Sequence, residues 1–171
     1  MRNLFTLFML AGSSTALAEP ERPHPTAYVS LGGVAGIEHL SVFGIQLEAG
    51  LRLGSSPFYA RGAVEGGAAA ALFDNGDYTT YRLGLEARLC GRRCWFAGID
   101  GAVRNAALVH HFDAGMPVTD HYDDGLIIPR VGIDIGRGHL HGRFAVEVPT
   151  AFDSEDTQVG IAAAAAVSYA F

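Results

Sequence analysis

Apolar and polar residues alternate with a period of two along most of this chain. In the clearest stretch, residues 43–54, every second residue is apolar and the residues between them are polar or glycine. A helix brings together residues three and four positions apart, whereas a strand places successive side chains on opposite faces. The pattern therefore predicts β-strands that each have one apolar face and one polar face.

Eight runs of this kind follow one another. Each contains about ten residues, the length with which a tilted strand crosses the hydrocarbon layer of a membrane. We assign them to residues 27–38, 43–54, 58–68, 81–89, 95–104, 127–136, 140–148 and 159–171. Short turns are expected at residues 54–57, 90–94 and 137–139, and longer polar loops at 72–79, 105–124 and 153–156.

Two prolines interrupt this regular picture. Each proline lacks the backbone N–H that a strand donates to its neighbour, so proline favours strand ends and bulges. We therefore expect a bulge or a strand end near Pro129 and another near Pro149.

The contents of the polar face indicate that it lies inside a barrel. This face is rich in glycine (Gly44, Gly50, Gly84, Gly132), which a narrow lumen requires and a wet outer surface does not. It also carries charges of both signs, which would neutralise one another in a lumen that has room only for side chains. The residues assigned to this interior network are Glu48, Arg52, Arg61, Glu65, Arg82, Glu86, Arg88, Asp100, Arg104, Arg130, Asp134, Arg143 and Glu147.

Aromatic residues on the apolar face lie near strand ends, where the girdle of a membrane barrel is found. They are Phe43, Phe58, Tyr81, Trp95, Tyr169 and Phe171. The predicted fold is therefore all-β, an eight-stranded antiparallel up-and-down transmembrane β-barrel with its apolar face toward lipid. The alternative is a secreted soluble barrel that buries the apolar face and binds a small ligand.

The N-terminal residues resemble an export signal. Arg2 precedes a short apolar run, and Ala16 and Ala18 form a small-residue cleavage site. The run is too short for a membrane-spanning helix, which argues against a retained anchor. We expect a signal peptide at residues 1–18, an extended proline-rich periplasmic lead-in at 19–25 and the outer-membrane barrel at 26–171.

Composition and cysteine spacing narrow the possibilities further. Net charge is −6, all 12 basic residues are arginine and no basic stripe is present, so nucleic-acid binding is not expected. Only 18% of residues are charged and mean hydropathy is +0.21, which is unusual for a soluble domain. Cys90 and Cys94 predict a disulfide in an exported protein, with a metal pair as the alternative.

Loop lengths predict the orientation of the barrel. Outer-membrane barrels keep short turns in the periplasm and longer loops outside. The turns after the second, fourth and sixth runs are short, and the connections after the third and fifth are long. Both termini are therefore expected in the periplasm, and the aspartate-rich loops are expected at the cell surface.

On these features the chain resembles the small eight-stranded outer-membrane barrels of the OmpA transmembrane-domain and OmpX type. The last residues, Tyr169-Ala170-Phe171, are similar to the signal that the barrel-assembly machinery reads in that family. The resemblance implies a Gram-negative outer-membrane protein, in contact with lipid and lipopolysaccharide, that assembles through this machinery as a monomer without a cofactor.

The expected surface loops carry the residues that could support chemistry. His110, His111, Asp113, His121 and Asp123 could bind a transition metal or supply a general base, although no fixed ligand spacing is present and a hydrated loop is the simpler interpretation. Acidic loop residues could bridge to lipopolysaccharide phosphates through Mg²⁺ or Ca²⁺.

Two functions remain open at this stage. The leading hypothesis is a non-enzymatic barrel with a plugged interior and a structural or surface-interaction role. The alternative is a lipid A acylase or deacylase that pairs a rim histidine with Ser41, near His39, or with Ser154.

Overall fold

The computed structural model describes residues 24–38, 40–71, 74–91, 93–110, 118–152 and 157–171. The predicted signal peptide and most of the predicted lead-in lie outside these residues. The strands are β1 (Ala27–Ile37), β2 (Ser41–Arg52), β3 (Phe58–Ala71), β4 (Asp74–Cys90), β5 (Cys94–His110), β6 (Val118–Arg137), β7 (Leu140–Glu147), β8 (Thr150–Phe152), β9 (Thr157–Val159) and β10 (Ile161–Ala170). No helix in the described part of the chain has the length and apolar character needed to span a membrane.

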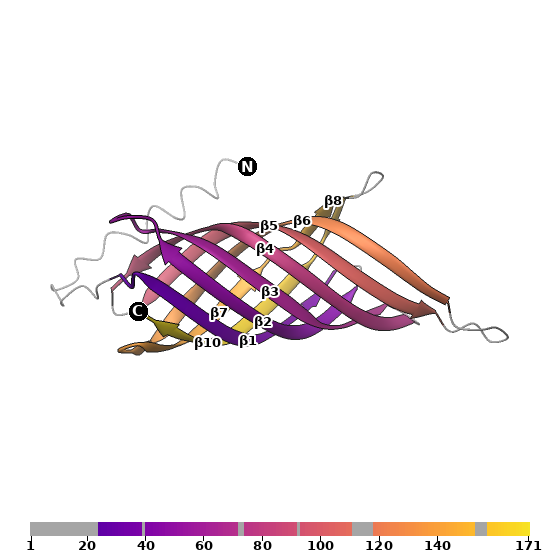
Figure 1. Cartoon of the computed structure of the whole chain (residues 1–171), viewed down its shortest axis with the longest axis horizontal. Helices are drawn as coiled ribbons and strands as arrows, with labels where there is room; N and C mark the ends of the chain where they lie inside the picture. The colour runs from indigo at the N-terminus through magenta and orange to yellow at the C-terminus, as the bar shows by residue number, and fades with distance from the viewer. Residues whose placement is uncertain (1–23, 39, 72–73, 92, 111–117, 153–156) are drawn as a thin grey trace, which may run out of the picture.

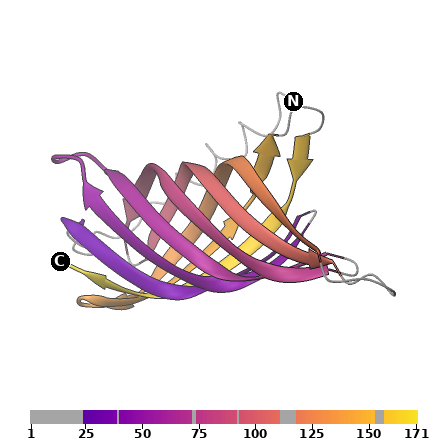
Figure 2. The same cartoon turned by 45° about the vertical axis from the view of Figure 1, so that its right-hand side comes forward.

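The strands form a closed barrel in which neighbours along the chain pair antiparallel (Figures 1 and 2). Closure comes from β1, which pairs with β2 on one side and with β10 on the other. The segments β7 and β8 pair with β6 in one continuous register and make one strand of the barrel. The segments β9 and β10 make another, so ten segments form eight strands and the predicted fold is confirmed.

The two prolines behave differently. Strand β7 ends at Glu147 and β8 begins at Thr150, so the interruption predicted near Pro149 is confirmed. The interruption predicted near Pro129 is wrong, because β6 runs through this residue without a bulge and pairs it with Ile99. The carbonyl oxygen of Pro129 still accepts a hydrogen bond from the amide of Val148 at 2.9 Å, which preserves one bond of that antiparallel pair.

Apolar side chains face outward around the whole barrel. Leu83 is 76% exposed and Leu89 is 73% exposed, whereas Glu86 and Asp100 on the alternate positions are fully buried. Since the apolar face lies outside, the interpretation as a soluble barrel with an apolar interior is wrong.

The predicted loops at 72–79 and 105–124 are mostly strand, which corrects the sequence analysis. Only residues 72–73 separate β3 from β4, and only residues 111–117 separate β5 from β6. In these segments side chains still alternate between the two faces, but the polarity of the faces is exchanged. Tyr78 and Leu108 point inward, whereas the polar residues Asp77 and Asn105 are exposed on the outer face. A polar outward face conceals the strand pattern from an analysis that looks for an apolar one.

One end of the barrel carries both chain ends, and we call it the terminal end. The amide of Thr26 donates to the carbonyl of Phe171 at 2.8 Å, and the turns after β2, β4 and β6 lie at the same end. The opposite end, called the loop end, is where β5 and β6 reach furthest along the barrel axis (Figure 1).

Adding a methyl group at Gly132 should destabilise the barrel. A Cβ atom there would collide with the carbonyl oxygen of Phe144 and with the ring of Phe96, whose Cε2 would lie 2.8 Å away. Because the oxygen belongs to the paired backbone, we expect Gly132→Ala to lower the free energy of unfolding by about 1–3 kcal/mol. Urea unfolding, followed by the fluorescence of the sole tryptophan, Trp95, measures this.

The matched control is Gly101→Ala on the outer face. Its nearest neighbour would be the carbonyl oxygen of Leu83 at 4.0 Å, so the change should stay within about 0.5 kcal/mol. Equal effects of the two substitutions would show that inward packing is not what selects glycine at position 132.

Candidate functional site

The barrel interior holds an extensive network of buried charges. It brings together twelve of the thirteen residues assigned to it from the sequence and adds Glu38. Among described residues, the arginines are Arg61, Arg82, Arg88, Arg104, Arg130 and Arg143, and the carboxylates are Glu38, Glu48, Glu65, Glu86, Asp100, Asp134 and Glu147. Six positive and seven negative charges give this set a formal charge of −1, so the lumen is close to neutral.

Glu86 lies at the centre of the network. Its side chain is fully buried and pairs with three arginines: Arg88 Nε at 2.6 Å, Arg130 Nη2 at 3.1 Å, and Arg143. Arg143 in turn reaches Glu48 at 3.2 Å and Asp134 at 3.1 Å. Removal of one charge would therefore leave several partners without compensation.

Toward the loop end, the network continues through Arg82. Its Nη1 donates to Glu147 Oε2 at 2.6 Å, and its Nη2 pairs with Glu65. The hydroxyl of Tyr78 donates to the other oxygen of Glu65 at 2.6 Å. Arg61 makes a parallel link, with Glu48 at 2.5 Å and with Asp100.

Toward the terminal end, aromatic rings stack on the guanidinium groups. Arg88 lies 3.9 Å from the ring centroid of Tyr28 and 4.5 Å from that of Tyr59. Arg143 lies 3.9 Å from the ring of Phe96 and 4.8 Å from that of Tyr28. These stacked contacts restrict the planar guanidinium groups and satisfy the faces that hydrogen bonds cannot reach.

Almost all these ion pairs join different strands. Among the described residues, only Arg88 and Glu86 pair within one strand. Opposite charges four positions apart on one strand, such as Arg82 and Glu86, are separated by about 13 Å of backbone. A partner across the narrow lumen is closer, which explains why the regular spacing in the sequence does not identify the pairs.

Arg52 does not belong to the interior charge network, so its assignment to that network from the sequence is wrong. Its guanidinium leaves the lumen and donates to the carbonyl oxygens of Ser55 and Ser56, each at 2.8 Å, at the turn after β2. Because it stands at the last position of β2, these carbonyls are its local acceptors.

Glu38 occupies the corresponding place at the loop end. It accepts from Arg104 Nη1 at 2.6 Å and from Nη2 at 3.1 Å, in the bidentate geometry that arginine favours. Glu38 lies on the polar face of the first run, and this position could have placed it in the predicted interior network.

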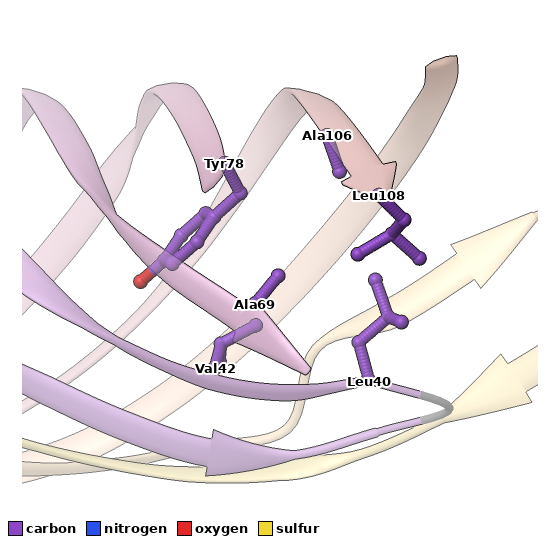
Figure 3. Close-up of a cluster of buried hydrophobic side chains, with 6 residues drawn as sticks. All are labelled: Leu40, Val42, Ala69, Tyr78, Ala106 and Leu108. Carbon is purple, nitrogen blue, oxygen red and sulfur yellow. The ribbon is translucent and has the colours of Figure 1, made fainter. Parts of the chain in front are cut away.

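A cluster of buried apolar side chains lies inside the barrel toward the loop end, which sequence reasoning missed. Leu40, Val42 and Leu108 converge there with Tyr78 (Figure 3), and Ala69 and Ala106 complete the buried group. A second buried group contains Leu126 and Ile128 with two alanines. The cluster lies beside the network, because Tyr78 belongs to both.

Only some of the residues considered for surface chemistry lie in the part of the chain that the structure describes. His121 and Asp123 are exposed on β6, and Asn105 donates to Asp123 at 2.5 Å. His111, Asp113, His39 and Ser154 lie outside the described residues, as does the position of the His110 side chain. Within the described residues, no three histidine, cysteine, aspartate or glutamate side chains are close enough to hold a metal ion.

The predicted disulfide between Cys90 and Cys94 is confirmed. The two cysteines face each other across β4 and β5 and close the turn at the terminal end. Tyr169 and Phe171 lie outward at the same end, with ring centroids 4.9 Å apart.

No protein-family model and no curated protein sequence matches the chain. Solved structures do match it. Neisserial surface protein A aligns with 90% of this chain and 100% of its own, at 11% identity and a TM-score of 0.62. The N-terminal barrel of Pseudomonas aeruginosa OprF aligns with 85% and 100% at 9% identity and a TM-score of 0.55.

A third structure is Ail, the attachment invasion locus protein of Yersinia pestis, in complex with the heparin analogue sucrose octasulfate. It aligns with 85% of this chain and 97% of its own, at 12% identity and a TM-score of 0.55. The chain therefore has the fold of the small eight-stranded outer-membrane barrels, as its resemblance to them implied.

Neutralising Glu86 should be costly. Glu86→Gln keeps the shape of the side chain but removes the charge that faces Arg88, Arg130 and Arg143. We expect the free energy of unfolding to fall by about 3–5 kcal/mol, the range for breaking a buried ion pair. Denaturant unfolding in detergent micelles provides the measurement.

Asp77→Asn is the matched control, since it also removes one carboxylate charge but at an exposed position of β4. Its effect should not exceed about 0.5 kcal/mol. A Glu86→Gln variant as stable as this control would mean that the buried pairs contribute nothing to folding.

Proposed function

We propose that this chain is an integral outer-membrane barrel with a filled interior that serves a structural or surface-interaction role. The observation that carries the proposal is that apolar and charged side chains are placed opposite to their usual arrangement in a soluble protein. A continuous apolar belt lies outside, and paired charges lie inside. Lipid is the solvent in which this arrangement is stable, because hydrocarbon tails cover the belt and the closed barrel leaves no strand edge unpaired.

The dimensions of the belt fit a membrane. Outward apolar residues extend from Tyr81 to Leu89 on β4, from Trp95 to Val103 on β5 and from Ile127 to Ile135 on β6. Each run contains about nine residues, which is what a strand tilted by about 45° needs to cross the hydrocarbon layer. Aromatic side chains mark both borders, with Tyr81 toward the loop end and Trp95 toward the terminal end.

The polar extensions support an orientation. Beyond Tyr81 and Val103 the outward face becomes polar and includes Asp77, Asn105 and His121. We place this loop end at the cell surface and the terminal end in the periplasm, consistent with an export signal at residues 1–18. Recognition of Tyr169 and Phe171 by the assembly machinery belongs to the same proposal.

We also propose that the lumen is plugged. Eight strands enclose space for side chains only, and here arginine–carboxylate pairs occupy its middle while Leu40, Val42 and Leu108 occupy the loop end. A hydrated ion would have to separate the pairs and cross the apolar cluster. Stability of the envelope, rather than transport, is the role that this interior favours.

The acidic residues at the loop end of this chain do not suit an anionic ligand of the kind bound in one of its structural neighbours. Sucrose octasulfate is strongly anionic. The described residues near the loop end include Asp74, Asp77, Asp120 and Asp123, whereas Arg104, which lies opposite Asp124 in the β5–β6 register, is buried. We therefore propose lipopolysaccharide as the neighbouring lipid, approached through divalent cations that join carboxylates to phosphates.

Membrane integration is tested by extraction and surface digestion. Cell membranes washed with carbonate should retain the protein, detergent should release it, and unheated samples should migrate differently from heated samples on a gel. Protease added to intact cells should cut in the connection between β5 and β6, residues 111–117, while the turn at Cys90–Cys94 stays protected. Release by carbonate alone would contradict the location, and protection of residues 111–117 with cutting at 90–94 would reverse the orientation.

The plugged lumen is tested in planar lipid bilayers. The reconstituted barrel should give no stable conductance above that of the bare membrane, because buried ion pairs and the apolar cluster block the path. A known porin, measured in parallel at the same protein-to-lipid ratio, is the positive control which shows that channels would be detected. Steady single-channel steps from this protein would refute the plug.

A further inference from the structure

The residues just before β1 contact inward side chains at the terminal end of the barrel. His24 and Pro25 belong to no strand, yet both are partly buried. The hydroxyl of Tyr59, a buried inward residue of β3, donates to the carbonyl oxygen of Pro25 at 2.6 Å. The Nη1 of Arg52 reaches the carbonyl oxygen of His24 at 3.4 Å. We call residues 24–26 the strap.

The base of the strap is fixed by backbone hydrogen bonds on both sides. The amide of Thr26 donates to the carbonyl oxygen of Phe171, and its carbonyl oxygen accepts from the amide of Arg52, each at 2.8 Å. Beyond this base only the two carbonyl contacts of His24 and Pro25 hold the strap. The proline ring limits the backbone of Pro25 and removes one donor, so ordering this short segment costs little conformational entropy.

The strap lies next to a layer of buried side chains near the barrel mouth. Tyr28, Tyr59 and Arg88 each stand within three residues of a strand end at this mouth, yet they are only 1%, 0% and 2% exposed. The two rings lie 3.9 Å and 4.5 Å from the Arg88 guanidinium. His24 and Arg88 border the same pocket of about 740 Å³, so the strap has open space beside it.

Arg88 carries a donor that favours opening of the mouth. Its Nε donates to Glu86 at 2.6 Å and its Nη1 pairs with Asp134 at 3.2 Å. Its Nη2 is buried and has no hydrogen-bond partner in the part of the chain that the structure describes. Water that entered the mouth would satisfy this nitrogen, since water accepts hydrogen bonds.

The closed and open arrangements of the strap are therefore closely balanced. Closing gains the hydrogen bonds from Tyr59 and Arg52 to the strap carbonyls, whereas opening hydrates Arg88. The net gain from a hydrogen bond and the cost of leaving a buried donor unsatisfied are of the same order. A segment held by two such bonds at the end of a chain opens locally far more easily than the strands below it.

We propose that residues 24–26 are a strap that opens and closes the terminal mouth of the barrel, that Tyr59 and Arg52 are its latch, and that it controls the access of water to Arg88. Arg82 lies six positions further from this mouth along β4 and stays out of reach of solvent in both states. The inference goes beyond the proposed function, because it holds on whichever side of the membrane the terminal end lies.

The reactivity of single arginines toward phenylglyoxal, which modifies accessible guanidinium groups, tests the strap. The full barrel in nonionic detergent micelles is treated with the reagent, and modified peptides are followed by mass spectrometry over time. Arg93 is exposed and serves as the internal reference for the reagent. In the wild-type protein we expect Arg88 to react at least about tenfold more slowly than Arg93, because it reacts only when the strap opens.

The variant Tyr59→Phe removes the hydroxyl that bonds Pro25 and keeps the ring that stacks on Arg88. Arg88 should then react about threefold to tenfold faster than in the wild type, the effect of losing one hydrogen bond. Arg52→Gln should also accelerate the reaction, since it removes the bond to His24. Arg82 should stay protected in both variants.

Tyr78→Phe is the matched control. It also removes a buried tyrosine hydroxyl, but one that donates to Glu65 toward the loop end, so the rate at Arg88 should stay at the wild-type value. Unheated gel migration identifies any variant that has not folded, and Arg52→Gln decides the outcome if Tyr59→Phe is lost in this way.

Three results would overturn the proposal. Equal rates at Arg88 and Arg93 in the wild type would show that the mouth is not closed. Wild-type rates in the folded latch variants would show that Tyr59 and Arg52 do not hold it. Equal acceleration by Tyr78→Phe, or acceleration at Arg82 in parallel with Arg88, would show that the whole barrel loosens and that no separate strap exists.

Discussion

The narrowness of an eight-stranded barrel is the constraint on which the rest of this structure depends. Closure through β1 and β10 pairs the backbone all round, and it leaves a narrow lumen into which the inward side chains must fit. Large inward residues therefore need small ones opposite them. Gly132 lies against the ring of Phe96, and Gly50 lies against the ring of Tyr28. Inward glycines such as these two follow from this geometry, whereas Gly54 and Gly138 lie in turns with positive φ.

The same constraint determines how the buried charges are arranged. At a buried position, a charge is tolerated only beside an opposite charge or a hydrogen-bonding partner. Glu86 meets arginines from β4, β6 and β7, and Arg143 meets carboxylates from β2, β4 and β6. Most of these pairs join different strands, so the network favours one relative placement of the strands. Ion pairs of this kind need not add much stability over apolar packing, but they penalise strands in the wrong register.

The two ends of the barrel differ in chemistry. At the loop end, apolar residues such as Leu108 are buried inside the barrel, while the outward face carries polar and acidic residues. At the terminal end, stacked tyrosines surround Arg88, and a disulfide-closed basic turn borders the belt. An acidic outer region and a basic inner rim suit the proposed orientation, in which divalent cations and lipopolysaccharide lie on one side and phospholipid headgroups on the other.

Four features could be predicted from the amino-acid sequence: the period of two, the eight runs, the outward direction of residues such as Leu83 and Leu89, and the pairing of Cys90 with Cys94. These features are local, because alternation records the solvent on each side of a strand and a disulfide across a short turn needs no distant partner. Three features became evident only in the folded barrel: Glu38 rather than Arg52 joins the charge network, Pro129 lies within an unbroken strand, and strands continue through much of residues 105–124. Each of these depends on the register and the closure of the barrel. Register chooses which charges meet across the lumen, and closure lets Leu108 and Tyr78 pack inside where the outer face is no longer apolar.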